Sequence, residues 1–177
     1  VVAGAVRTPI GRFGGGLLKL SAADLGTAAA IEAMKRAGVV PDAIDETLFG
    51  LGRQAGGGTN TARQISIRAG VPNTVPAMTI NKACASSVKT IAQAFDMIQL
   101  GRDRAALVGG TESMSNTPYL LTNARFGYRL GNSEVVDGMY RDGFQCPIAN
   151  VLMGVTAENL AEQYSITRDE QDAYAER

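Results

Sequence analysis

The sequence predicts an α/β fold in which a mostly parallel sheet is flanked by helices. Two observations lead to this class. Short apolar runs that suit buried strands alternate with longer amphipathic segments that suit helices. Strands that alternate with helices favour right-handed crossovers, which make the sheet parallel and place helices on its faces. The expected strands cover residues 1–6, 47–51, 77–80 and 105–108.

Local signals mark the ends of the first expected helix. Ser21 and Asp24 have the spacing of a capping pair at its start, and Gly38 is typical of its end. Charged side chains lie opposite the apolar ones, so this helix is amphipathic and suited to packing on a sheet. Its apolar stripe is expected at Thr27, Ala30, Ile31, Met34 and Ala37.

Two further helices are predicted in the first part of the chain. One runs from about Asn60 to Ala69, and the other begins just past Cys84 and ends at Leu100. The longer helix follows strand 77–80 directly, so Cys84 falls at the carboxyl end of that strand, where parallel sheets carry their working sites. One face of this helix carries Val88, Ile91, Ala92, Phe95 and Ile98.

The periodicity is lost between residues 113 and 151, where turn residues, scattered aromatics and isolated charges replace it. An irregular stretch of this length is uncommon inside a compact domain and is usually functional. A helical pattern returns near Gly154, and Thr167 with Glu170 forms a second capping pair. The expected domains are an α/β domain at residues 1–113 and an irregular and helical region at residues 114–177.

The composition of the chain argues against two classes of partner. The 177 residues carry 17 basic and 17 acidic side chains without a basic run, so no nucleic-acid partner is expected. No apolar run approaches the roughly 18 residues that span a bilayer, so no membrane partner is expected either. Two cysteines make no disulfide framework, and a reactive thiol needs reducing surroundings, so the expected location is cytoplasmic. No metal site is predicted.

Cys84 is the candidate nucleophile. It stands between a strand and a helix, where unpaired backbone N–H groups and the positive end of the helix dipole favour the thiolate form. The alternative is a small buried hydrophobic residue, a common fate for free cysteine. A nucleophilic cysteine usually works with a neighbouring base, most often histidine, and the chain contains no histidine. Either the chemistry is elsewhere, or the base lies on another segment.

The stretch around Cys84 resembles the acyl-enzyme motif of the thiolase family. In that motif an Asn, two spacers, the Cys, a small residue and a Ser lead into an amphipathic helix, as Asn81, Cys84, Ala85 and Ser86 do here. Ser87 stands where many members carry glycine, a small-for-small change. Other blocks resemble the family in the same order and are spread in register along the whole chain: residues 6–11, 108–115, 153–159 and 167–172.

The resemblance implies a thiolase-like fold and an acyl-CoA C-acyltransferase, in its acetyl-CoA acetyltransferase form. The Cys84 thiolate would attack an acyl-CoA or 3-ketoacyl-CoA, form an acyl-enzyme, and pass the acyl group to an acetyl-CoA carbanion or to free CoA. The Cys84 backbone N–H can also donate to the developing oxyanion. Coenzyme A thioesters are then substrates, and no permanently bound cofactor is expected.

The same resemblance assigns roles to residues outside the motif. The region 114–177 would begin the CoA-binding loop domain, truncated at the chain end. There Phe144 and Met153 would line the pantetheine channel, or alternatively pack as ordinary core residues. Cys146 matches no catalytic position and is expected to be structural. Asn81 and Glu112 are expected to be scaffold polar groups near the site.

A complete thiolase is considerably longer than this chain. Its second half carries the Gly-His-Pro histidine, a second cysteine in a Cys-x-Gly-Gly-Gly setting and an Asn-bearing oxyanion hole, none of which occurs here. We therefore expect an N-terminal portion that needs the C-terminal half and is inactive alone. Residues 123–139 resemble the segment that pairs dimers in tetrameric members, so a homodimer or homotetramer is expected. The alternatives are a degradative 3-ketoacyl-CoA thiolase, a non-catalytic half-thiolase acting as a binding or oligomerisation module, and a ketosynthase-like condensing enzyme.

Overall fold

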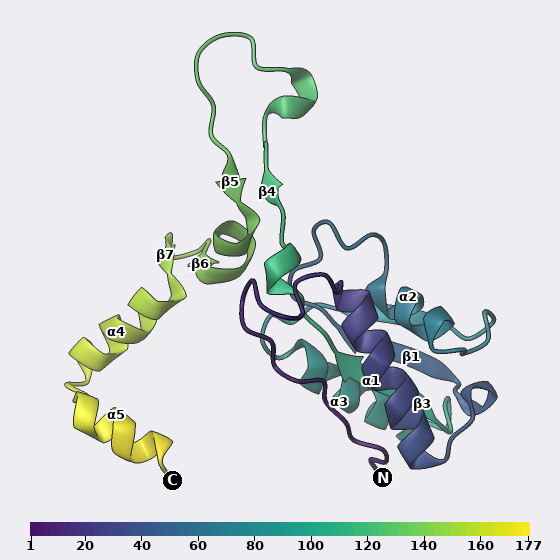
Figure 1. Ribbon diagram of the computed structural model, residues 1–177. Coiled ribbons are helices and arrows are strands. Elements are labelled where there is room, and N and C mark those ends of the chain that lie inside the picture. Colours follow the sequence, from purple (N-terminus) through teal and green to yellow (C-terminus); the bar gives the residue numbers. More distant parts are fainter. The chain divides into compact units, whose positions relative to one another are not determined.

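The computed structural model describes residues 1–177 and divides the chain into two compact units (Figure 1). The first unit, Val1–Pro118, holds a sheet with helices packed on it. The second unit, Tyr119–Arg177, holds two short hairpins and two α-helices. None of the helices is long and apolar enough to cross a bilayer.

A three-stranded sheet forms the centre of the first unit, in the order β2-β1-β3. Both pairings are parallel, and the register sets Gly50 opposite Ile80 on one side and Gly110 on the other. The carboxyl ends of all three strands therefore meet at one edge. The α/β class with a parallel sheet is confirmed. The strands are β1 (Glu46–Gly50), β2 (Ala77–Ile80) and β3 (Ala106–Gly110).

Helices α1 (Ala22–Ala37) and α2 (Thr61–Arg68) pack on one face of this sheet. Successive side chains of a strand point to opposite faces, so Thr47 and Phe49 of β1 share this side. The buried Thr47 Oγ1 lies 3.2 Å from Ser66 Oγ of α2, which satisfies both hydroxyls. The core here includes Ala30, Met34, Phe49, Ala62, Ile65 and Leu107.

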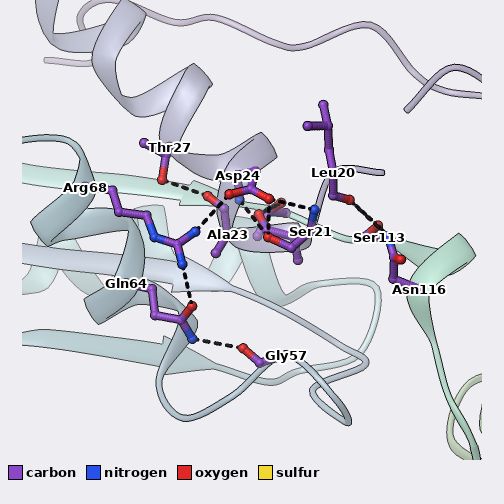
Figure 2. Close-up of polar contacts among 12 residues, drawn as sticks. Leu20, Ser21, Ala23, Asp24, Thr27, Gly57, Gln64, Arg68, Ser113 and Asn116 are labelled. Carbon is purple, nitrogen blue, oxygen red and sulfur yellow. Dashed lines mark hydrogen bonds and ion pairs between the residues drawn. The ribbon is translucent and has the colours of Figure 1, made fainter. Parts of the chain in front are cut away.

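The junction of α1 and α2 is tied together by polar side chains (Figure 2). The predicted capping box is confirmed: Ser21 Oγ accepts the Asp24 N–H, and the Asp24 carboxylate accepts the Ser21 N–H at 3.0 Å. Asp24 also pairs with Arg68 of α2, with Nη1 to Oδ1 at 2.9 Å. Arg68 and Gly57 are then joined through Gln64, whose amide donates to the Gly57 carbonyl at 2.9 Å.

The segment after β3 is fastened to the loop that precedes α1, which explains why the first unit extends to Pro118. Ser113 Oγ donates to the Leu20 carbonyl at 2.9 Å, and Asn116 Nδ2 donates to the same carbonyl at 3.0 Å (Figure 2). Ser115 Oγ accepts the Gly14 N–H at 3.0 Å. The short 3-10 helix Met114–Asn116 carries two of these side chains.

Residues 1–6 form no strand, so the predicted first strand is wrong. Val1 and Val2 are exposed, and no strand of the sheet pairs with this segment. The segment instead approaches α1, where Gly4 has a φ of 64° and leaves no room for a side chain beside the Ala33 carbonyl. An apolar run becomes a strand only where a neighbouring strand accepts its backbone hydrogen bonds, and none does here.

Two predicted details of the first unit also need correction. In α1 the buried side includes Ala23 and Gly26, whereas Ile31 is exposed, so the apolar stripe is rotated from the predicted one. The reason is α2, because Ile65 packs directly against Gly26. The strand predicted at 105–108 is β3, Ala106–Gly110, so the two glycines expected to end it lie within it. The predicted stop of α1 at a left-handed Gly38 is confirmed.

Helix α3 (Ser86–Gln99) packs on β1 and β3 from the other side of the sheet, the side of Gly50 and Gly110. The residues that α3 buries are small: Ser86, Thr90 and Ala94. Its large apolar side chains are exposed, with Val88 at 66% and Phe95 at 62%. The predicted apolar face therefore exists, but it does not pack on the sheet.

The second unit is built from short elements. A long loop joins the first hairpin's two strands and appears as an arch in Figure 1. The capping box of Thr167 and Glu170 is confirmed at the start of the last helix. The elements are β4 (Tyr119–Leu120), a 3-10 helix (Ala124–Phe126), β5 (Val136–Asp137), a π-helix (Tyr140–Phe144), β6 (Gln145–Cys146), β7 (Val151–Leu152), α4 (Met153–Gln163) and α5 (Arg168–Ala175).

Candidate active site

Cys84 lies on the turn between β2 and α3. Strand β2 ends at Ile80 and α3 begins at Ser86, so the cysteine stands just before the helix, as the sequence predicted. It is a free and exposed cysteine. The alternative, a small buried hydrophobic residue, is therefore wrong, because Cys84 is exposed. The position combines access for a reagent with the positive end of a helix dipole.

The turn that carries Cys84 is closed by two polar side chains. Asn81 Oδ1 accepts the Ala83 N–H at 3.0 Å. Ser86 Oγ accepts the Lys82 N–H at 2.8 Å and donates to the Ala83 carbonyl at 2.6 Å. These bonds satisfy backbone groups of Lys82 and Ala83, the two residues before the cysteine, so the turn is fixed by side chains as well as by the helix.

Ala83 has a left-handed backbone, with a φ of 48°. A non-glycine residue in this region is strained by about 1–3 kcal/mol and persists only where its surroundings hold it. The hydrogen bonds that Asn81 and Ser86 make to Ala83 provide such surroundings. Strain of this kind immediately before an exposed thiol is typical of a functional turn.

The first turn of α3 has no side-chain cap. Its N-cap residue, Ala85, has no side-chain oxygen to accept an N–H group of the first turn. Serine, threonine, aspartate or asparagine usually occupies this position. The partial positive charge at such a helix start favours negative charge that develops beside it, such as an oxyanion.

Two glycines allow α3 to reach the carboxyl edge of the sheet. A Cβ on Gly50, at the end of β1, would lie 2.6 Å from the backbone of Ser86 and Ser87. A Cβ on Gly110, at the end of β3, would collide with the Ser87 side chain. The predicted position of Cys84 at the carboxyl ends of the strands therefore depends on two strand residues without side chains.

Glu112 lies just after β3 and faces the segment that leaves β1. Its Oε2 accepts the Gly52 N–H at 3.1 Å and the Arg53 N–H at 3.3 Å. Burial raises the pKa of Glu112, and the N–H groups of Arg53 and Gly52 oppose that rise. Asn81 reaches the same segment, since its Nδ2 donates to the Gly52 carbonyl at 2.9 Å. The two expected scaffold residues are thus linked through one glycine, a connection that the sequence reasoning missed.

Phe144 and Met153 belong to the second unit. The hairpin of β6 and β7 pairs Gln145 with Leu152, so Phe144 and Met153 flank the last pair of its register. Both side chains are exposed, at 36% and 44%. Phe144 also makes an edge-on contact with Tyr140, with ring centroids 5.6 Å apart. The two predicted CoA-binding residues therefore adjoin the same end of one hairpin, and neither is an ordinary buried core residue.

Cys146 stands in β6 of the same hairpin. It is free and half-buried, and its Sγ accepts the Ala149 N–H at 3.4 Å. The backbone N–H groups of Ala149 and Ile148 lower the pKa of this thiol. No group of three potential metal-ligating side chains lies together anywhere in the chain.

These features define an α/β protein whose exposed cysteine sits at the carboxyl edge of a parallel sheet, before an uncapped helix. The family described as "Thiolase, N-terminal domain" matches residues 1–177, the whole chain. The chain belongs to the thiolase family. The resemblance of its sequence blocks to that family is thereby confirmed.

Three relatives illustrate the match. A "Probable acetyl-CoA acyltransferase" of Staphylococcus aureus (strain COL) is 46% identical over 175 residues, which are 99% of this chain and 44% of that protein. The crystal structure of the Bacillus anthracis acetyl-CoA acetyltransferase is 43% identical, with a TM-score of 0.93 over 100% of this chain and 45% of that one. Acat5 thiolase from Ascaris suum, crystallised in complex with coenzyme A, is 42% identical, with a TM-score of 0.91 over 96% of this chain and 44% of that one. The chain spans less than half the length of each.

Proposed function

We propose that this chain supplies the nucleophile of an acyl-CoA C-acyltransferase, specifically an acetyl-CoA acetyltransferase. The observation that carries the proposal is the exposed Cys84 on the turn before α3. The proposal is supported by membership of the thiolase family and by similarity to the acetyl-CoA acetyltransferase of Bacillus anthracis.

The proposed first half-reaction takes place at Cys84. Its thiolate attacks the thioester carbonyl carbon of acetyl-CoA, the new C–S bond forms, and the CoA thiolate leaves. Negative charge develops on the carbonyl oxygen during the attack. The dipole of α3 is suited to stabilise that charge, and so are the N–H groups of its first turn beyond Ser86, whose own N–H already donates to the Ala83 carbonyl at 3.1 Å.

In the proposed second half-reaction an acetyl-CoA carbanion attacks the acetyl carbon, a C–C bond forms and the Cys84 thiolate leaves, which gives acetoacetyl-CoA. In the reverse direction Cys84 attacks the keto carbon of acetoacetyl-CoA, the C–C bond breaks with acetyl-CoA leaving as the carbanion, and free CoA then accepts the acetyl group as the Cys84 thiolate leaves. Both directions need a base to activate the thiol and a group that moves the second proton. The chain contains no histidine, so we assign these groups to the rest of the full-length gene product. The exposed apolar face of α3 supports this, because a further domain could cover it.

The second unit is proposed to begin the CoA-binding loop domain. Phe144 and Met153 adjoin the same end of the β6–β7 hairpin, and their exposed apolar surfaces suit the pantetheine arm. The coenzyme A in the Ascaris suum thiolase structure supports a CoA thioester as ligand. The β4–β5 arch carries exposed Phe126 and Leu130, which suits a role in forming a homodimer or homotetramer. A cytoplasmic location fits a catalytic thiol, because that compartment keeps thiols reduced.

Trapping of the acyl-enzyme tests the proposal. The full-length gene product is mixed with acetyl-CoA, quenched in acid, digested and analysed by mass spectrometry. We expect an acetyl group on the peptide that contains Cys84, its loss in Cys84→Ala, and its retention in Cys146→Ala. Acetyl transfer should fall by about 10⁴-fold or more in Cys84→Ala, the size of loss seen when a nucleophile is removed.

The trapping assay and the rates of 3-ketoacyl-CoA cleavage together separate the rival functions. A degradative 3-ketoacyl-CoA thiolase would also form an adduct on Cys84, but it would cleave longer 3-ketoacyl-CoA substrates faster than acetoacetyl-CoA. A non-catalytic oligomerisation module would form no adduct. Acetyl transfer at the wild-type rate in Cys84→Ala would contradict both enzymatic assignments.

A further inference from the structure

One polar chain connects the exits of all three strands at the edge that carries Cys84. It starts at Glu112, which follows β3 and whose carboxylate accepts the N–H of Gly52 at 3.1 Å. Gly52 follows β1, and its carbonyl accepts a hydrogen bond from Asn81 Nδ2 at 2.9 Å. Asn81 follows β2. It ends where Asn81 Oδ1 accepts the Ala83 N–H at 3.0 Å. Ala83 is the residue immediately before the cysteine.

The chemistry of Asn81 suits this position in a way that other side chains do not. Its amide donates with one atom and accepts with the other, so it bonds to two backbone segments at once. Aspartate would keep the acceptor toward Ala83 and lose the donor toward Gly52. Alanine would lose both.

The exposure of Asn81 argues against a role in stability alone. The residue is exposed, and its removal costs one hydrogen bond at the half-buried Gly52 and one at the exposed Ala83. What its removal does free is the backbone of Ala83, which the Asn81 acceptor helps to hold at a φ of 48°. A change in the Ala83 backbone angles would reorient the Cys84 backbone and with it the direction of the Cys84 side chain.

Glu112 acts one step further from the cysteine. It is half-buried, and its carboxylate receives the N–H groups of Gly52 and Arg53 together. These bonds fix the peptide whose carbonyl is the partner of Asn81. Glutamine retains an oxygen that can accept from Gly52, whereas alanine retains nothing.

We propose that Asn81 and Glu112 are positioning residues for acyl transfer: through Gly52 they hold the turn at Ala83 and thereby aim the Cys84 sulfur at the substrate carbonyl. This inference rests on the proposed function of Cys84. Because the two residues act through the turn and touch no substrate, their loss should lower kcat and leave KM nearly unchanged.

The test uses the full-length gene product with Asn81→Ala, Asn81→Asp, Glu112→Gln and Glu112→Ala. Steady-state kinetics with acetoacetyl-CoA and CoA give kcat and KM, and a thermal unfolding scan monitors folding. We expect kcat to fall about 10- to 100-fold in Asn81→Ala, the size of effect that a misplaced reacting group produces. Asn81→Asp should be intermediate, and Glu112→Gln should retain near wild-type kcat where Glu112→Ala does not.

Asn60 provides a matched control. It is also an exposed asparagine whose amide bridges two backbone segments, since Nδ2 donates to the Ala77 carbonyl and Oδ1 accepts the Arg63 N–H. It also has a left-handed backbone, with a φ of 45°, but it caps α2 and makes neither bond to the Cys84 turn. Asn60→Ala should lower the unfolding temperature and leave kcat unchanged.

The outcomes are distinct. Wild-type kcat in Asn81→Ala, or a rise in KM with kcat unchanged, overturns the positioning role. An equal loss of kcat in Asn60→Ala also overturns it, because a general loss of stability then explains the effect. If Glu112→Ala fails to fold, the two Asn81 variants and Glu112→Gln still decide. Activity in Cys84→Ala instead refutes the proposed function itself, so the two failures are separable.

Discussion

Gly50, the last residue of β1, lies directly against the backbone of Ser86, the first residue of α3: a Cβ on the glycine would come within 2.6 Å of the Ser86 carbonyl carbon. This contact fixes how closely the helix behind Cys84 approaches the sheet. The neighbouring atoms are backbone atoms, so they cannot move aside as a flexible side chain could.

We therefore predict that Gly50→Ala destabilises the protein by about 1–3 kcal/mol, the usual cost of overpacking, and slows alkylation of Cys84 by displacing α3. Chemical denaturation and iodoacetamide labelling of the full-length gene product measure the two effects. Gly16→Ala is the matched control, since a Cβ at Gly16 meets nothing within 4 Å. Equal stability of the two variants would mean that the helix has room to shift.

Iodoacetamide should modify Cys84 well before Cys146. Cys84 is exposed on its turn, whereas Cys146 is half-buried in a hairpin with its sulfur already accepting the Ala149 N–H. Peptide mass spectrometry of samples quenched over time measures both rates in one protein. The lowered pKa of Cys146 favours its own thiolate, so equal rates or a faster Cys146 would show that access does not decide the order.

The start of α1 should weaken in acid. Hydrogen bonds from the Ser21 hydroxyl and backbone hold the pKa of Asp24 below its ordinary value of 3.8. A lowered folded pKa gives stability that is present above pH 3.8 and lost as the pH falls through the folded pKa. Amide hydrogen exchange in the first turn of α1, compared with Asp24→Asn at each pH, should show wild-type protection converging on the variant in acid. A constant difference would contradict the sign.

Phe95→Glu should destabilise the full-length gene product by at least about 3 kcal/mol, the usual cost of losing a buried phenylalanine. Phe95 is 62% exposed in this chain, and the prediction requires that the remainder of the protein covers it. Gln99→Glu, at a polar and exposed position of the same helix, is the control. An unchanged denaturation midpoint in Phe95→Glu would show that the face stays in water.

Signals that act within a few residues were predictable from the sequence. The Ser21–Asp24 and Thr167–Glu170 capping boxes and the glycine stop at Gly38 depend on neighbours in the chain, and all three are confirmed. The bounds of β2 were also correct, because an apolar run there is closed by a turn. The turn position of Cys84 followed from the same local reasoning.

Features that depend on a distant partner were not predictable in this way. Residues 1–6 are apolar enough for a strand but have no strand beside them. Ile31 is exposed because α2 packs against the side of α1 that carries Gly26. The periodicity predicted the apolar face of α3 correctly, but it could not show that this face points away from the sheet. The link from Glu112 to Asn81 runs through the backbone of Gly52, which no side-chain pattern reveals.

The methyl group of Ala83 bears on how this protein could be altered. Glycine would adopt a φ of 48° without strain, so Ala83→Gly would remove the strain of the folded turn. Glycine would also allow the loop many other backbone conformations. Selection for heat tolerance at this residue and selection for turnover would therefore favour different amino acids.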